Sequence, residues 1–384
     1  MQKDFHYYAA YCAAVIAGYS HEDAMDICYS DQFTDDCSRT LLKAVGGPSS
    51  AATTQLQLEL MDARLGITGL QDITRIWSSF HFLPRDLYAV TPRASKAYKN
   101  RYRLICGPNS ELLEETVNLA QGKSLQAAGI AMHILSDTWA HAYFAGTPSM
   151  VINNTDYYFY EKMENGTERQ IVFRHSASSP DDVDQGKYTN SLYQASEYTI
   201  MNLGHGRAGH FPDYSYARYR YLPAWGQYEE IVKDNPSDYY HAFCQMVYAL
   251  KCLKDGVRFE KDVYAFEDVE PYKEEIETIL RTRKRNTCDE WKAFAKKLSG
   301  VEIEDYDDKK YRDEYKDAQD GAKDSTFLGK YFVSAMAQKS MVTNKIFSSG
   351  NLLAGFSVDY SKSGFKGIRD FRSLVSYIER EVKK

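Results

Sequence analysis

The segment AMHILSDTWAHAYFAG, residues 131–146, places His133, Asp137 and His141 at intervals of four residues. At 3.6 residues per turn, these side chains share one face of a helix whose other positions are mostly apolar. Buried imidazole and carboxylate groups are costly unless they find hydrogen-bond partners or bind a metal ion. Because the four-residue spacing brings two donors to one ion, the segment predicts a metal site, with a hydrogen-bonded His–Asp network as the alternative.

Two segments near the N-terminus add carboxylates and one imidazole. Asp4 and His6 stand directly before the first expected helix. In YSDQFTDDCS, Asp31 and Asp35 are one helical turn apart, and Asp36 is adjacent. Three like charges this close repel one another unless water or a cation neutralises them. We therefore expect Asp35 and Asp36 to be ligands, whereas Asp31 fits a solvated helix end equally well.

Three more histidines lie in two later segments. His81 is surrounded by aromatic and apolar residues in WSSFHFLP, where a histidine is either a core residue with satisfied hydrogen bonds or a ligand. In LGHGRAGHFPD, glycines around His205 and His210 allow backbone geometries that point both rings at one centre, and Asp213 follows closely. This segment lacks the GK[ST] ending of a phosphate-binding loop, which favours a metal over a phosphate. The expected ligands are Asp4, His6, Asp35, Asp36, His81, His133, Asp137, His141, His205 and His210.

These donors exceed the needs of one tetrahedral ion, so we expect two or three ions, with Zn²⁺ as the first candidate and Mn²⁺ or Fe²⁺ as alternatives. Asp137 would bridge the ions, and a metal-activated hydroxide would attack a phosphoester by in-line displacement. Asp137 and Asp35 are the expected catalytic residues. Arg207 and Tyr216, in a segment rich in tyrosine and arginine, are the expected substrate-binding residues, with a solvated basic segment as the alternative.

The composition limits the class of protein. The formal net charge of −6 over 384 residues argues against nucleic-acid or anionic-membrane binding driven by net charge. Seven cysteines without a CxxC pair indicate reduced thiols in a cytoplasmic protein. The stretch YYAAYCAAVIAG has the length of a signal-peptide core, but its tyrosines and the preceding Asp4 and His6 disfavour secretion. No apolar run reaches the roughly 20 residues that a transmembrane helix needs.

The expected fold is mainly α, a multi-helix bundle around the metal cluster. Helices are expected at residues 7–18, after the N-cap Ser20, and from the N-cap Ser124 to Gly146. A small strand pair or covering loop follows near residues 151–179, and then a helix near 191–203. Amphipathic helices continue from about residue 236. We therefore expect a helical metal-binding, catalytic domain over residues 1–235 and a helical C-terminal region over 236–384 that can pack on the same core.

The order of these residues resembles that of the zinc-dependent phospholipases C and the related single-strand-specific nucleases. Shared features are a histidine close to the N-terminus, an aspartate some thirty residues later, an isolated histidine near residue 81, and HxxxD followed by two further histidines. The chain also looks like a member of an uncharacterised bacterial family distantly allied to that superfamily. The resemblance covers roughly residues 4–213. It implies the ligands His6, Asp35 or Asp36, His81, His133 and a bridging Asp137, with His141 and either His205 or His210 completing another site.

The sequence departs from this pattern at two points. Those enzymes use a free N-terminal amino group as a ligand, whereas five residues precede His6 here, so we expect Asp4 to take that place. The histidine after HxxxD also comes sooner than is usual, at His141, and without the family's proline. Both departures affect how many ions the chain is expected to bind and which substrate is expected.

Two classes of function remain open. The first is a hydrolase of small phosphoesters or phospholipid-like substrates, and a nuclease stays possible within it. The second is a helical scaffold or binding protein with a structural metal or a buried His/Asp network. The His-Asp class of phosphohydrolases is disfavoured because the chain has no adjacent His-Asp pair. Solvent access separates the two classes, since structural sites are closed by protein ligands and catalytic sites keep an open position.

Overall fold

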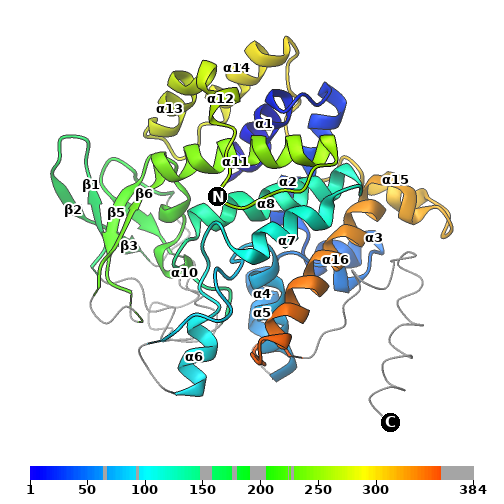
Figure 1. Ribbon diagram of the computed structural model, residues 1–384, viewed down its shortest axis with the longest axis horizontal. Coiled ribbons are helices and arrows are strands. Elements are labelled where there is room, and N and C mark those ends of the chain that lie inside the picture. The colour runs from blue at the N-terminus through cyan, green and yellow to red at the C-terminus, as the bar shows by residue number, and fades with distance from the viewer. Residues whose placement is uncertain are drawn as a thin grey trace.

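Helix α8 (Leu125–Ala140) lies at the centre of the molecule (Figure 1). The Ser124 side chain accepts a hydrogen bond from the amide of Ala127, which confirms the predicted N-cap. Nearly every residue of α8 is buried, as its apolar character on all sides requires. The helix ends at Ala140, earlier than the sequence predicted, and His141 occupies the C-cap position.

The computed structural model describes residues 1–63, 67–91, 95–147, 158–174, 180–190, 205–223, 225 and 229–355. Within these ranges the fold is mainly α, as predicted. The helix expected near 191–203 lies outside the described residues. The helices before α8 are the π-helix η1 (Asp4–Ala9), α1 (Ala10–Ile16), α2 (His21–Asp36), α3 (Arg39–Val45), the 3₁₀ turn η2 (Ser49–Ala51), α4 (Gln57–Ala63), α5 (Ile67–Phe80), α6 (Lys96–Tyr102) and α7 (Glu111–Ala120).

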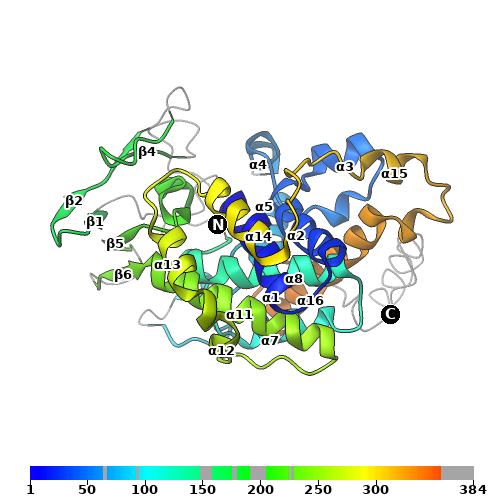
Figure 2. The ribbon, with the colours of Figure 1, turned by 90° about the horizontal axis from the view of Figure 1, so that it is seen from above.

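A short β region lies at one end of the helical body (Figure 2). Its antiparallel sheet has the strand order β2-β1-β5-β6, and β3 and β4 form a separate parallel pair. The strands are β1 (Tyr160–Lys162), β2 (Glu168–Gln170), β3 (Val172–Arg174), β4 (Lys187–Thr189), β5 (Arg218–Tyr221) and β6 (Ile231–Asp234). Between β4 and β5 stand the short helix α10 (His205–Ala208) and the 3₁₀ turn η3 (Phe211–Asp213).

The helices after residue 234 share the core of the N-terminal ones. They are α11 (Asn235–Asp255), α12 (Phe266–Val269), η4 (Glu270–Tyr272), α13 (Lys273–Arg281), α14 (Cys288–Ser299), α15 (Arg312–Asp317), η5 (Lys323–Ser325) and α16 (Phe327–Ser348). Both α11 and α16 pack directly against α8, and α14 packs on η1 and α1. One hydrophobic cluster accordingly runs from Met1 to Ala354. Among the described helices, none combines the length and apolar character needed to cross a bilayer.

Helices α2 and α8 approach each other closely in this core. A Cβ atom at Gly129 would lie 2.5 Å from the Cβ of Ser30 and closer still to the carbonyl oxygen of Ile27. Real carbon atoms do not approach this closely, so only glycine lets the two backbones meet here. The contact places Asp31, next to Ser30, opposite His133, one helical turn after Gly129.

We predict that Gly129→Ala destabilises the fold. Alanine favours a helix over glycine by about 1 kcal/mol, but the overpacked methyl group costs about 1–3 kcal/mol or more because it meets backbone atoms. Urea denaturation should therefore show a net loss of stability. An unchanged or higher unfolding midpoint would contradict the tight crossing of α2 and α8.

Candidate metal centre

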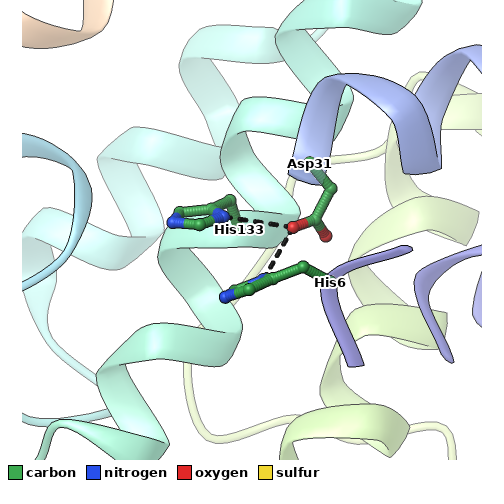
Figure 3. A group of neighbouring side chains, drawn as sticks. All are labelled: His6, Asp31 and His133. Atoms are coloured by element: carbon green, nitrogen blue, oxygen red, sulfur yellow. Dashed lines mark hydrogen bonds and ion pairs between the residues drawn. The ribbon is translucent and has the colours of Figure 1, made fainter. Parts of the chain in front are cut away.

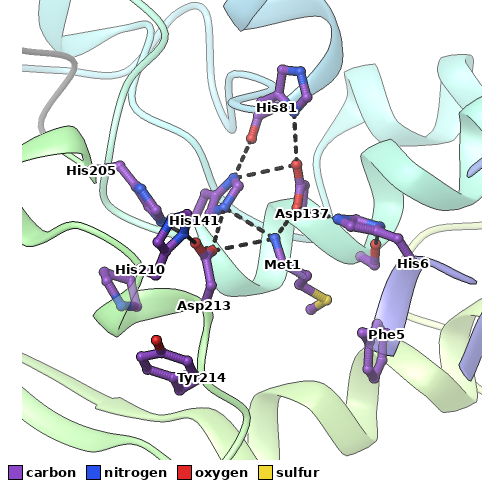
Figure 4. Close-up of polar contacts among 12 residues, drawn as sticks. Met1, Phe5, His6, His81, Asp137, His141, His205, His210, Asp213 and Tyr214 are labelled. Carbon is purple, nitrogen blue, oxygen red and sulfur yellow. Dashed lines mark hydrogen bonds and ion pairs between the residues drawn. The ribbon is translucent and has the colours of Figure 1, made fainter. Parts of the chain in front are cut away.

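The carboxylate of Asp137 lies at the middle of a cluster of nitrogen donors (Figure 4). Its side chain is only 1% exposed. Around Oδ1 lie the α-amino nitrogen of Met1 at 2.6 Å and His6 Nε2 at 3.3 Å. Around Oδ2 lie His81 Nδ1 at 3.2 Å, His133 Nε2 at 3.3 Å and His141 Nδ1 at 3.4 Å. Donors from η1, the end of α5, α8 and its C-cap thus meet at one side chain.

Three groups of side chains around Asp137 could hold a metal ion. The first is Asp35, His81 and His133, from the ends of α2 and α5 and from the middle of α8. His133 Nε2 lies 3.2 Å from His81 Nδ1, and Asp35 Oδ1 lies 3.7 Å and 3.8 Å from these two nitrogens. Asp35 is 33% exposed, while both imidazoles are buried. This group therefore has one side that reaches solvent.

The second group is His6, Asp31 and His133 (Figure 3). Asp31 Oδ1 lies 2.8 Å from His6 Nδ1 and 3.2 Å from His133 Nδ1. All three side chains are 0% exposed. This group is closed to solvent.

The third group is His141, His205 and Asp213, at the C-cap of α8, in α10 and in η3. The Nε2 atoms of the two histidines lie 3.0 Å and 3.1 Å from Asp213 Oδ1. The Met1 amine is 3.3 Å from the same oxygen, which connects this group to Asp137. His210 Nδ1 lies 3.6 Å from Asp213 Oδ2, with a side chain that is 65% exposed. His210 therefore stands at the rim.

Backbone carbonyls fix the protonation of two of the rings. His81 Nε2 lies 3.0 Å from the Thr53 carbonyl oxygen, and His141 Nδ1 lies 2.7 Å from the His81 carbonyl oxygen. A carbonyl only accepts hydrogen bonds, so each of these nitrogens carries a hydrogen. The opposite nitrogens, His81 Nδ1 and His141 Nε2, are left with free lone pairs toward the cluster. This is the arrangement that orients metal-binding histidines.

The electrostatics of the cluster favour cations. Burial disfavours the charge on His133, but Asp137 and Asp35 outweigh that effect and raise its pKa to about 10. In the same way, Asp137 and Asp213 overcome burial and raise the pKa of the Met1 amine to about 11. Burial lowers the pKa of His141 to about 4, which leaves that ring neutral. Metal ions and protons compete for the same nitrogen atoms. The negative charge of the carboxylates therefore favours binding of either a proton or a metal ion at these nitrogens.

Two of the expected ligands, Asp4 and Asp36, have their hydrogen-bond partners outside the three groups. Asp4 Oδ2 instead accepts hydrogen bonds from the backbone amide (2.9 Å) and hydroxyl (3.0 Å) of Thr287, the N-cap residue of α14. Asp36 follows Asp35 by 100° around α2, so its carboxylate points elsewhere and accepts a hydrogen bond from the Tyr306 hydroxyl at 2.6 Å. The Met1 amine, which the sequence did not suggest, occupies the place beside Asp137 that was expected for Asp4.

Two further cluster residues were absent from the expected ligand set. Asp31 is buried by α8 at its crossing with α2, and not solvated as a helix end. Asp213 is three residues after His210, and this short spacing had already indicated that the two residues are neighbours. The only sequence signal for Asp31 was its one-turn distance from Asp35.

The two residues expected to bind substrate lie in different surroundings. Arg207 is buried within α10, the short helix that also carries His205. Tyr216 lines a cavity of about 510 Å³ together with Arg218, Arg281 and Arg283, and none of the residues that line this cavity belongs to the metal centre. The expected role of Tyr216 in substrate binding therefore has no support from a contact between this cavity and the cluster.

Helix α16 supports the loop that orients His81. The Tyr331 hydroxyl donates to Thr34 Oγ1 at 3.0 Å and approaches Thr53 Oγ1 at 3.4 Å. Lys339 Nζ donates to the Ala52 carbonyl at 3.0 Å. Contacts from α16, in the C-terminal region, therefore hold the loop that carries the Thr53 carbonyl, and this carbonyl orients the His81 ring.

Comparison with known proteins gives one match. The chain belongs to a family described as "Family of unknown function (DUF6765)", which matches residues 1–346. Neither the curated proteins nor the solved structures contain a match to this chain. The family spans both the metal centre and the helices that support it.

Lys339 gives a pH-dependent prediction. Burial lowers its pKa from 10.5 to about 7, so between these values the unfolded chain binds one proton more than the folded chain. The free energy of unfolding therefore gains up to about 1.4 kcal/mol per pH unit from this group as the pH rises above 7. Lys339→Met should stabilise the protein more at pH 6 than at pH 9. Equal effects at both pH values, measured by urea denaturation, would contradict the shift, and exposed Lys330→Met is the control.

Asp4→Ala separates a structural role from a ligand role. Loss of the two hydrogen bonds to Thr287 should cost about 1–2 kcal/mol of stability, because they tie η1 to the start of α14. The metal content per chain, measured by inductively coupled plasma mass spectrometry, should stay at the wild-type value. A variant that folds but loses a metal equivalent would show that Asp4 is a ligand.

Proposed function

We propose that this member of a family of unknown function is a metal-dependent hydrolase of phosphoesters. The observation that carries the proposal is that both oxygens of the buried Asp137 face nitrogen donors from different parts of the fold. One carboxylate can therefore bridge two ions, which is the arrangement that two-metal hydrolysis requires.

The surrounding donors fit more than one ion. Asp35, His81 Nδ1 and His133 Nε2 would complete a site at Asp137 Oδ2. Asp213 and the Nε2 atoms of His141 and His205 would form a second site. His6 Nε2 is buried, has no hydrogen-bond partner among the described residues, and faces Asp137 Oδ1 near the Met1 amine, where a third ion would bind. Imidazole and carboxylate donors suit Zn²⁺, with Mn²⁺ or Fe²⁺ as alternatives.

Solvent access favours catalysis over a purely structural centre. Asp35 is 33% exposed and His205 is 14% exposed, so two of the three groups have a side open to water. Closed sites are typical of structural metals, and open positions are typical of catalytic ones. A substrate would reach the centre from the side of Asp35 or from the side of His205.

The chemistry divides between the ions and the chain. When bound, the ions would lower the pKa of a water molecule and stabilise negative charge on the phosphoester oxygens. The Asp137 carboxylate lies between the donors of the two sites and keeps them at a fixed separation. Asp35, the partly exposed carboxylate at the open side, is placed where it would take the proton of a water molecule that such an ion activates. The negative net charge of the protein favours small phosphoesters over nucleic acids as substrates.

One observation supports a second candidate, a helical scaffold with a structural metal. His6, Asp31 and His133 are completely buried, so the ring nitrogens that His6 and His133 present to Asp137 are closed to water on this side, as in structural sites. This candidate predicts bound metal without turnover of any phosphoester.

The first test is the metal content of protein purified without a metal-affinity column. Wild type should contain two or more equivalents of a transition metal, and Asp137→Ala should lose them because the bridge is removed. His241→Ala is the control, since His241 belongs to none of the three groups: its Nδ1 donates to the Ser237 carbonyl oxygen 2.8 Å away, and its ring stacks on Trp139. Less than about half an equivalent in wild type, even after incubation with zinc, manganese or iron, would contradict the metal centre.

The second test is activity on bis(p-nitrophenyl) phosphate and p-nitrophenyl phosphate. We expect hydrolysis by wild type, loss with a chelator, and recovery on addition of metal. Asp35→Ala should lower kcat by at least about 100-fold, because it removes both a ligand of the first site and the carboxylate placed for proton transfer. Full metal occupancy without turnover of a broad set of phosphoesters would favour the scaffold.

A further inference from the structure

His6 and His133 are stacked face to face beside Asp31 (Figure 3). Their ring centroids are 4.0 Å apart, and the ring planes differ by 20°. Both Nδ1 atoms face the same carboxylate oxygen, Asp31 Oδ1, at 2.8 Å and 3.2 Å. Two elements, η1 and α8, thus direct their imidazoles at one side chain of α2.

This geometry excludes a single ion bound by both Nδ1 atoms. The lone pair of an imidazole nitrogen lies in the ring plane, so a metal ion must lie close to that plane. Two stacked rings whose centroids lie 4.0 Å apart and whose planes differ by only 20° offer no such common position beside their Nδ1 atoms. The Nδ1 atoms of His6 and His133 are instead at hydrogen-bond distance from Asp31. An ionised carboxylate only accepts hydrogen bonds, so each Nδ1 carries a hydrogen.

We propose that Asp31 is a positioning residue that holds the Nδ1 hydrogens of both His6 and His133 and thereby presents both Nε2 atoms as metal ligands. His6 Nε2 lies 3.3 Å from Asp137 Oδ1, and His133 Nε2 lies 3.3 Å from Asp137 Oδ2. One buried carboxylate therefore orients one ligand on each side of the bridging carboxylate. The inference rests on the proposed function and assigns Asp31 a place in it.

The other oriented rings show why a carboxylate is used here. His81 and His141 donate to neutral backbone carbonyls, of Thr53 and of His81. A charged acceptor forms a stronger hydrogen bond and makes the imidazole a better metal ligand. A buried carboxylate shared by two N–H donors avoids part of the penalty that an unpaired charge would bring.

The variants Asp31→Ala and Asp31→Asn separate a positioning residue from a ligand. Zinc affinity would be measured by competition with a chelator, and the number of ions by mass spectrometry. Asp31→Ala should bind the same number of ions about 10–100-fold more weakly. Asp31→Asn should lose less affinity, because its amide oxygen still accepts hydrogen bonds. Asp26→Asn, on the same helix, is the control. Loss of one whole equivalent in both variants would show that Asp31 is itself a ligand and would overturn the proposal.

A measurement on the wild type covers the case in which neither variant folds. Long-range ¹H–¹⁵N spectra of zinc-loaded protein with ¹⁵N-labelled histidine report which ring nitrogen carries hydrogen. We expect Nδ1–H for both His6 and His133, with the metal on Nε2. Hydrogen on Nε2 of either ring would overturn the proposal.

The outcomes distinguish this inference from the function on which it rests. If wild type binds no metal, the proposed function fails and the role of Asp31 fails with it. If wild type binds metal and Asp31→Ala keeps wild-type affinity, only the role of Asp31 fails.

Discussion

The burial of the Asp137 charge is the constraint on which the rest of the structure depends. A carboxylate that is almost fully removed from water is unstable unless positive or hydrogen-bonding groups surround it. Here the compensation comes from the Met1 amine and from imidazoles of η1, α5, α8 and the α8 C-cap. Each of these elements must be placed to within a few tenths of an ångström. The packing of the helical body therefore determines how well the charge of Asp137 is compensated.

Strand β6 and the described helices beyond residue 234 contribute to that placement, and none of the three groups takes a donor from them. Lys233, in β6, donates to the carbonyl of Trp139 at 2.6 Å, in the last turn of α8. A cation there complements the negative end of the helix and the free carbonyls next to His141. On the other side, α16 fixes the loop behind His81. The C-terminal region is thus better described as the outer support of the centre than as a separate unit.

Much of this could be predicted from the sequence, because some signals are local. The spacing of His133, Asp137 and His141 needs only the period of a helix, and the caps Ser20 and Ser124 need only the residues that follow them. The surroundings of Asp4 and Asp36 could not be predicted, because the direction of each side chain depends on partners, Thr287 and Tyr306, that are about 270 residues or more away in the chain. A local sequence pattern contains no information about partners so far away in the chain.

The donors of the centre come from distant parts of the chain, from Met1 to Asp213. Closing a loop of this length costs chain entropy that only later contacts repay, so the centre assembles late in folding. An ion bound across these segments would act as a cross-link, much as a disulfide does, and would slow the first step of unfolding. The centre would then determine the lifetime of the folded protein as well as its chemistry.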